Sequence, residues 1–277
     1  MFVETNIYSM LARLLPESII PAPGRPGYLQ RLYASVGLPA QRALMGESFT
    51  LVARLDEAAC LQTVYLDLRQ QALGGSVTAL NDLGWIWLNG KYWVADHELA
   101  RQLLRMAAVQ GSGVACYNLG QQCYFGKGVP VAYASAADYY RLAFDRGFVQ
   151  AAAALGDLYE EEVCTDDLAQ PWQVDLQQAY RWFDKGARKG DARCRFEVGY
   201  RLLHGIQVAP DRKAGVYWLE LAAVAGVMAA AEELAVYFSL IEPSRPYRFW
   251  RDQAIALGSE LALTMKLDDQ VQPSGEK

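Results

Sequence analysis

A pair of small or apolar residues recurs along this chain at a nearly constant spacing. The pairs are Leu83-Gly84, Leu119-Gly120, Leu155-Gly156, Val198-Gly199 and Leu234-Ala235. Their second members are separated by 36, 36, 43 and 36 residues. A glycine eight residues after a bulky side chain keeps the same step until a last interval of 32 residues, at Gly111, Gly147, Gly190, Gly226 and Gly258. Two independent landmarks that stay in step indicate a repeated structural unit.

Each unit predicts a pair of helices. The first helix, as in "VTALNDLGWIWL" at 77–88, carries small or apolar residues at i, i+3, i+4 and i+7 and ends at a glycine-containing turn. The second opens at an N-cap residue, Asp96, Asp175 or Asp211, and closes at the terminal glycine, which suits a left-handed C′ position. A helical hairpin this short cannot bury both apolar faces alone, so the units must stack into an α-solenoid.

The pattern A-x-x-x-LG-x-x-Y-x-x-G-x-GV, followed by D-x-x-x-A-x-x-W-Y/F-x-x-A-A-x-x-G, resembles the Sel1-like repeat, a relative of the tetratricopeptide repeat. The resemblance covers Gly75 to Gly258. It implies an all-α fold, a right-handed α/α superhelix of stacked helical hairpins with about five 36-residue repeats. Cys123, Ala132, Gly215 and the turn "EPSRPY" depart from the pattern, and we expect them to weaken individual hairpins.

The repeats divide the chain into segments. We expect an N-terminal arm with short helices and a proline-rich loop, a degenerate capping helix pair, five repeats, and a C-terminal helix end with a disordered tail. The arm either packs over the N-terminal end of the solenoid or is separable. The expected bounds are 1–42 for the arm, 43–74 for the capping pair, 75–111, 112–147, 148–190, 191–226 and 227–258 for the repeats, and 259–277 for the C-terminal helix end and tail. Within this last segment, "KLDDQVQPSGEK" at 266–277 is expected to be disordered.

Charge and hydropathy exclude several classes of function. The net charge is −5, basic and acidic residues are interleaved and no Lys/Arg cluster occurs, which argues against nucleic acid or an anionic membrane as partner. The longest apolar run, 221–231, is shorter than the roughly 18 residues that a membrane span needs. The N-terminus lacks the pattern of an export signal. We therefore expect a cytoplasmic protein without membrane insertion.

No constellation of catalytic or metal-binding residues emerges from the sequence. The two histidines, His97 and His204, are expected at the surface, and neither a zinc spacing nor a phosphate-binding loop occurs. The cysteines form no recognisable pair and are expected to be free thiols; they are Cys60, Cys116, Cys123, Cys164 and Cys194. We expect no catalytic residue, no metal and no cofactor. An enzyme of cell-wall chemistry, a role linked to cysteine-rich relatives, is the alternative of another class.

The resemblance also implies a binding groove on the first helices. In the tetratricopeptide repeat, groove-facing positions lie six and three residues before the landmark glycine and one and four after it. The transfer gives Thr78, Asn81, Trp85, Leu88, Val114, Tyr117, Gln121, Tyr124, Gln150, Ala153, Asp157, Glu160, Arg193, Phe196, Tyr200 and Leu203. The aromatic members either line a partner-binding groove or belong to the core. Trp182, Trp218 and Trp250 match the family's inter-helix packing position and are expected in the core.

The interval of 43 residues places a seven-residue insertion in the third repeat, within Glu160 to Val174. It is either a solvated acidic loop or a rim loop that contacts a partner through an exposed Trp172, with Asp166 and Asp167 beside it. The predicted function is a non-enzymatic scaffold or adaptor that binds a peptide or protein partner in the groove. An inhibitor, such as an immunity protein that neutralises a toxin, is the alternative, and the oligomeric state stays open.

Overall fold

The computed structural model describes residues 10–20, 22, 51–56, 61–162, 172–241 and 245–271. Their regular elements are helices, as predicted. These residues fall into two compact units, one ending at Val174 and the other beginning at Asp175. The third predicted repeat therefore contributes its first helix to one unit and its second helix to the other.

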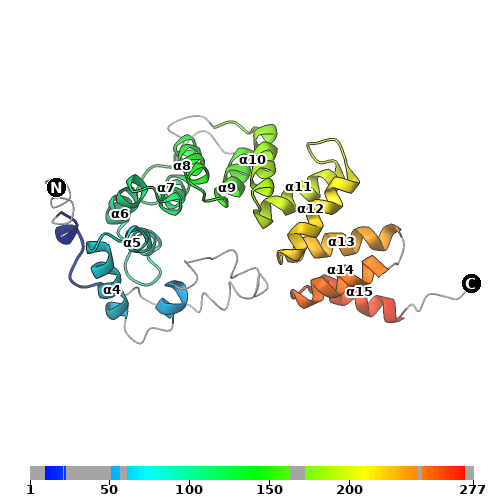
Figure 1. The fold of residues 1–277 in the computed structure, drawn as a ribbon, viewed down its shortest axis with the longest axis horizontal. Coiled ribbons are helices and arrows are strands. Elements are labelled where there is room, and N and C mark those ends of the chain that lie inside the picture. Colours follow the sequence, from blue (N-terminus) through cyan, green and yellow to red (C-terminus); the bar gives the residue numbers. More distant parts are fainter. Residues whose placement is uncertain are drawn as a thin grey trace, which may run out of the picture. The chain divides into compact units, whose positions relative to one another are not determined.

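The first unit contains six labelled helices that pack in chain order (Figure 1). Helices α5 and α6 form one hairpin, α7 and α8 form the next, and α6 and α8 each pack on the helix that follows. Helix α4 packs on α5, and α5 also contacts α7. The bounds are α4 (Leu61–Leu73), α5 (Val77–Asn89), α6 (His97–Val109), α7 (Gly113–Phe125), α8 (Tyr133–Asp145) and α9 (Ala151–Glu160).

The second unit repeats this arrangement. Helix α10 packs on α11, α11 and α12 form a hairpin, α13 and α14 form another, and α15 packs on α14. First helices of neighbouring hairpins, α11 and α13, again contact one another. The bounds are α10 (Leu176–Arg188), α11 (Ala192–His204), α12 (Arg212–Val224), α13 (Met228–Ile241), α14 (Arg245–Ala256) and α15 (Glu260–Val271). In both units, the first helices form one layer, and we call its solvent-facing surface the first-helix face.

The helix ends follow the sequence pattern closely. Asp96, Asp175 and Asp211 accept hydrogen bonds of 2.9, 2.9 and 3.0 Å from backbone N–H groups three residues on, as predicted. Ala132, which lacks a capping oxygen, makes no such bond. The terminal glycines adopt φ angles of 88–99°, which confirms their left-handed C′ role. First helices have caps that the sequence analysis missed: Ser76, Ser112 and Asp191.

The landmark glycines let the two helices of a hairpin approach closely. A Cβ atom on Gly120 would lie 2.5 Å from Cε1 of Tyr140, and one on Gly199 would lie 2.9 Å from the backbone N of Leu219. Gly215 faces the same contact from α12, where its Cβ would meet Leu203 N at 2.7 Å. The expectation that Gly215 weakens its hairpin is therefore wrong, because this close approach of α11 and α12 leaves no room for the usual alanine.

We predict that Gly215→Ala lowers the free energy of unfolding by about 1–2 kcal/mol. The added methyl group meets backbone atoms that cannot turn aside, and overpacking outweighs the gain of up to about 1 kcal/mol in helix propensity. Gly74→Ala is the control, because a Cβ there meets its neighbours at 3.4 and 3.5 Å. Urea titrations of both variants measure the effect, and equal stabilities would contradict the tight contact.

The described part of the N-terminal arm packs on the first unit. Leu11, Leu15 and Ile19 are buried, and Gln62 on α4 bonds to the chain at both Ile19 N and Glu17 O. Further along, Val94 N donates to Ile20 O at 2.8 Å, and Ala22 N donates to Tyr92 O at 3.1 Å. Of the two predicted alternatives, residues 10–20 and 22 take the first and cover α4 and the α5–α6 turn. Residues 23–50 lie outside the described residues.

Tyr65 is the centre of this N-terminal contact. Its hydroxyl donates to Pro16 O, and its ring packs edge-on against Trp87 and Trp93, with centroids 6.3 and 5.6 Å away. Burial raises the pKa of Tyr65 from 10.0 to about 12, because the phenolate would lose its hydration. The folded state therefore favours the neutral phenol.

We predict that the first unit loses stability at alkaline pH. The folded pKa of Tyr65 exceeds the unfolded one, so its contribution is complete below pH 10.0 and is lost as the pH rises to about 12. Urea titrations across this window, followed together with tyrosinate absorbance, measure the loss. The loss should be smaller in Tyr65→Phe, whose ring cannot ionise, and a parallel decline in both proteins would rule out this origin.

Two of the three tryptophans expected in the core are buried. Trp182 is 9% exposed and Trp250 is 7% exposed. Trp218 is only partly buried, so the prediction is wrong for this residue. Leu219, which is fully buried, occupies the central core position on α12, and Trp218 lies at its edge against the exposed Tyr217.

The difference in burial between Trp250 and Trp218 predicts that their alanine variants lose unequal amounts of stability. Trp250→Ala should lower the free energy of unfolding by about 3–5 kcal/mol, as for other buried aromatic residues. Trp218→Ala should cost clearly less, because more of its ring already faces water. Denaturant titration followed by far-UV circular dichroism compares the two, and an equal or larger loss for Trp218→Ala would refute the assigned burial.

The C-terminal segment is more ordered than expected. Residues 266–271 were predicted to be part of a disordered tail, but they complete α15. Asp269 accepts a hydrogen bond of 2.9 Å from the Tyr247 hydroxyl and pairs with Arg251, while Ala262 is fully buried. Asp269 is therefore held by two partners on α14, Tyr247 and Arg251, that the local sequence does not reveal. Residues 272–277 lie outside the described residues.

Candidate partner-binding face

The predicted groove residues of the first unit divide by burial. Trp85, Tyr117, Gln121 and Tyr124 are partly exposed on α5 and α7, as are Asp157 and Glu160 on α9; Thr78, Val114 and Gln150 are exposed or partly exposed as well. These positions therefore offer surface for a ligand on the first-helix face.

Asn81 and Leu88 are buried, at 7% and 2% exposure, and cannot present their side chains to a partner. The prediction that Asn81 and Leu88 line the groove surface is therefore wrong. The same holds for Ala153 and Leu203, which are also buried. Asn81 Oδ1 instead accepts a 2.9 Å hydrogen bond from Asn118 Nδ2, which joins α5 to α7. The reason is that contact between neighbouring first helices covers one edge of each helix.

Gln121 organises the middle of this face. Its Nε2 donates to the Tyr117 hydroxyl at 3.1 Å and to the Tyr140 hydroxyl at 2.9 Å. The Tyr117 ring packs against Tyr140 and Phe148, with centroids 5.3 and 5.0 Å away. Burial raises the pKa of Tyr140, so its hydroxyl stays protonated. These contacts hold a partly exposed tyrosine in one orientation.

Tyr124 forms the acidic end of the face. Its hydroxyl donates to the Glu161 carboxylate, and its ring stands edge-on to Phe125 and Tyr133. Burial, and then the Glu161 carboxylate, raise the pKa of Tyr124. The sequence analysis included Tyr124 among the groove residues but not Glu161, because nothing in the repeat pattern marks the residue that follows α9.

Trp172, which follows the insertion, packs near the end of the first-helix face that contains Tyr124. It is partly buried, its Nε1 donates to Leu158 O at 2.9 Å, and its ring lies 5.2 Å from that of Tyr159 and 6.2 Å from that of Tyr133. Trp172 is thus only partly exposed, because its indole is hydrogen-bonded to α9, and its contact with a partner stays a prediction. Asp166 and Asp167, the other two residues of the predicted rim loop, lie outside the described residues.

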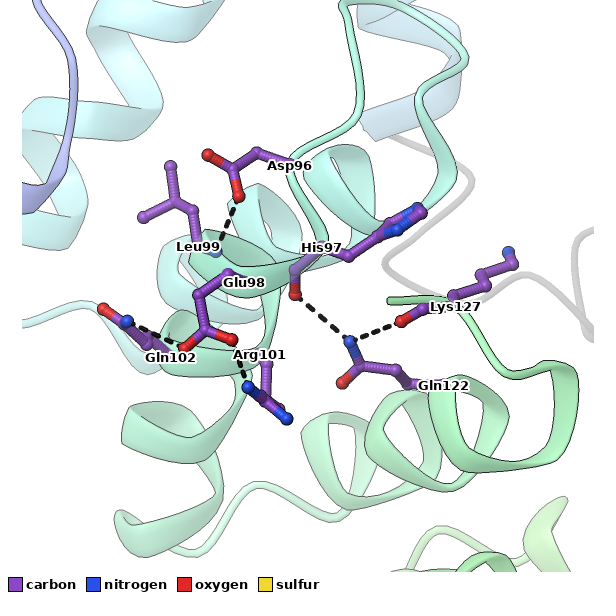
Figure 2. Close-up of polar contacts among 8 residues, drawn as sticks. All are labelled: Asp96, His97, Glu98, Leu99, Arg101, Gln102, Gln122 and Lys127. Carbon is purple, nitrogen blue, oxygen red and sulfur yellow. Dashed lines mark hydrogen bonds and ion pairs between the residues drawn. The ribbon is translucent and has the colours of Figure 1, made fainter. Parts of the chain in front are cut away.

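The turn after α7 is tied to the preceding hairpin, as Figure 2 shows. The buried Gln122 amide donates to the carbonyl oxygens of His97, at 3.1 Å, and Lys127, at 2.9 Å. Lys127 Nζ in turn donates to Asn89 Oδ1 at 2.7 Å and lies 5.6 Å from the Phe125 ring centroid. A charged and an aromatic side chain are thus fixed beside the first-helix face.

The second unit carries its own set of predicted groove residues. Arg193 is exposed, and Phe196 and Tyr200 are partly exposed on α11 with their centroids 5.8 Å apart. Tyr200 also packs against His204, whose Nε2 lies 2.5 Å from Glu233 Oε1 on α13. His204 is the last residue of α11 rather than part of the turn, and this contact joins neighbouring first helices.

Chemistry-bearing groups do not gather elsewhere in the described residues. Cys116, Cys123 and Cys194 form no disulfide there, and burial raises the thiol pKa values of Cys116 and Cys123. Within 10–20, 22, 51–56, 61–162, 172–241 and 245–271, no group of three or more His, Cys, Asp or Glu side chains could hold a metal ion. None of the helices in these ranges has the length and apolar character to cross a membrane.

The family model of the Sel1 repeat matches residues 77–112, 113–148, 149–191 and 192–227, more than half of the chain. The chain belongs to the Sel1 repeat family. These matches coincide with the hairpins of α5 to α8, with α9 and α10, and with the α11–α12 hairpin. The third match is longer than the others and contains the insertion.

Similar proteins include both a curated sequence and solved structures. An uncharacterized protein of Neisseria meningitidis is 29% identical over 128 residues, 46% of this chain and 25% of the relative, so the match spans a quarter of that protein. A Sel1 repeat protein from Oxalobacter formigenes aligns with a TM-score of 0.60 and 24% identity over 79% of this chain and 87% of that one. A protective antigen of uropathogenic Escherichia coli aligns with a TM-score of 0.58 and 21% identity over 76% and 44%. These likenesses establish the fold.

Proposed function

We propose that this Sel1 repeat chain is a protein-interaction scaffold, without enzymatic activity of its own, that binds a peptide or protein segment on its first-helix face. The placement of Trp85, Tyr117 and Tyr124 carries the proposal, since these three rings are partly exposed on neighbouring first helices. Aromatic side chains of this kind contribute much of the energy of protein interfaces.

Preorganisation of the face supports the proposal. Gln121 and the rings around Tyr117 and Tyr124 fix these side chains before a ligand arrives, which lowers the entropic cost of binding. Cys116 and Cys123, which form no disulfide among the described residues, support a reducing, cytoplasmic setting as part of the same proposal. The alternative of an inhibitor that neutralises a toxin stays a prediction that no described feature favours.

Selection of peptides from a display library on the full chain tests the proposal. We predict that the chain selects binding peptides and that Trp85→Ala, or Tyr200→Ala in the second unit, weakens the best of them by tenfold or more, on the order of a hot-spot residue. Fluorescence anisotropy with the selected peptides measures the affinity.

Exposed aromatic residues on second helices provide matched controls. Tyr217 on α12 is 56% exposed and Phe249 on α14 is 52% exposed. Their alanine variants should leave the affinity within about twofold, since they lie off the first-helix face. Circular dichroism melts establish that all four variants stay folded. Equal losses for both groups, or the absence of any selected peptide, would overturn the proposal.

A further inference from the structure

Glu161 is a partly buried carboxylate that has no counter-charge within the part of the chain that the structure describes. It accepts a hydrogen bond from the Tyr124 hydroxyl, and among the described residues it forms no ion pair with a lysine, arginine or histidine. An ionised carboxylate has two oxygens and room for several donors, so one hydroxyl leaves most of its accepting capacity unused. A carboxylate partly removed from water gains most from a cation that completes its environment.

Four aromatic rings are arranged around this end of the first-helix face. Tyr124 and Tyr133 have centroids 5.4 Å apart, Tyr133 and Trp172 are 6.2 Å apart, and Trp172 and Tyr159 are 5.2 Å apart. All four side chains are partly exposed. They come from the end of α7, the start of α8, the end of α9 and the segment after the insertion. We call these rings, together with Glu161, the ring–carboxylate cluster.

The electrostatics of the ring–carboxylate cluster favour a cation over an anion or an apolar group. The faces of aromatic rings carry negative charge density, and a cation within about 6 Å of a ring centroid is attracted to it. Glu161 adds a negative charge, and burial first and then this carboxylate raise the pKa values of Tyr124 and Tyr133. The ring faces and the Glu161 carboxylate therefore both attract a cation to the ring–carboxylate cluster.

The nearby basic side chains are engaged by other groups. Arg141 pairs with Asp138 at 2.6 Å and bonds to the Tyr159 hydroxyl, while Lys127 donates to Asn89. The inserted sequence "EVCTDDLAQP", 162–171, contains no lysine or arginine that could serve. Among the described residues, no basic side chain pairs with Glu161, so a cation of a bound ligand has an acceptor there.

We propose that the ring–carboxylate cluster receives a lysine or arginine side chain of the bound segment, so that the partner of this scaffold is a basic peptide. The carboxylate pairs with the cationic head, and the rings contact its face and its aliphatic stem. This inference rests on the proposed function, because it names the chemistry of the segment that the first-helix face binds. The inference also gives a role to the position of Glu161, which is partly buried beside Tyr124 rather than fully exposed to solvent.

The peptide selection described above provides the probe. Peptides selected on the full chain should share a lysine or arginine at one position, and replacement of that residue by the neutral isosteres citrulline or acetyl-lysine should weaken binding about tenfold. Direct comparison of the lysine and arginine forms establishes which of the two cations the cluster prefers.

Glu161→Gln is the decisive variant, because glutamine keeps the length of the side chain and an oxygen that can accept from Tyr124. Glu161→Gln should lower the affinity for the cationic peptide about tenfold but leave the affinity for its neutral isostere unchanged. The four affinities together form a double-mutant cycle. Glu162→Gln is the matched control, with the same change at the adjacent exposed residue, and should have no such effect.

Variants of Tyr133 separate the contribution of the aromatic ring to binding from that of the Glu161 charge. No described residue forms a hydrogen bond with its hydroxyl, so Tyr133→Phe should keep the affinity, whereas Tyr133→Leu should lower it severalfold by removal of the π face. Selected peptides that bind through Trp85 but carry no shared cation, or equal effects of Glu161→Gln and Glu162→Gln, would overturn the inference and leave the scaffold proposal standing. A failure to select any peptide would instead remove the scaffold proposal.

Discussion

The structure depends on the contact between the two helices of a hairpin at a residue without a side chain, as in the hairpins α5–α6, α7–α8 and α11–α12. Where Gly199 and Gly215 face each other across α11 and α12, the hypothetical Cβ of Gly215 lies 3.0 Å from Gly199 O. A contact this close fixes the hairpin as a rigid piece, and its second helix can then pack on the first helix of the next hairpin. Stacking in this order leaves one side of each first helix towards solvent, which is the face proposed to bind.

The insertion in the third repeat shows how a departure from the period can build a site. Seen only as sequence, 160–174 is a run of carboxylates with a tryptophan near its end. In the structure, that tryptophan bonds to Leu158 O and brings its ring beside those of Tyr133 and Tyr159. The residues that flank the insertion, rather than a freely exposed loop residue, therefore supply the chemistry of this end of the face. The proposed preference for a basic partner follows from these flanking contacts.

Burial separates residues that the repeat pattern treats as equivalent. Asn81 and Tyr117 both lie three residues before a landmark glycine, yet Asn81 is buried against Asn118, and Tyr117 remains partly exposed against Phe148. Trp250 and Trp218 likewise share a pattern position but differ in burial. A repeat pattern indicates which face of a helix points inward on average. The size of the neighbouring side chains decides whether a residue at the edge of that face is buried or exposed.

The sequence by itself determined the family, the paired helices, the capping aspartates and the left-handed glycines. These features arise from local backbone chemistry and from a period of 36, both of which are visible in one chain. The tertiary structure alone decided that Glu161 accepts from Tyr124 and forms no ion pair within the described ranges, that Asn81 and Leu88 are covered, and that the segment 266–271 is helical. Each of these depends on side chains from other helices, such as Tyr124 for Glu161 and Arg251 for Asp269, and no local pattern specifies such partners.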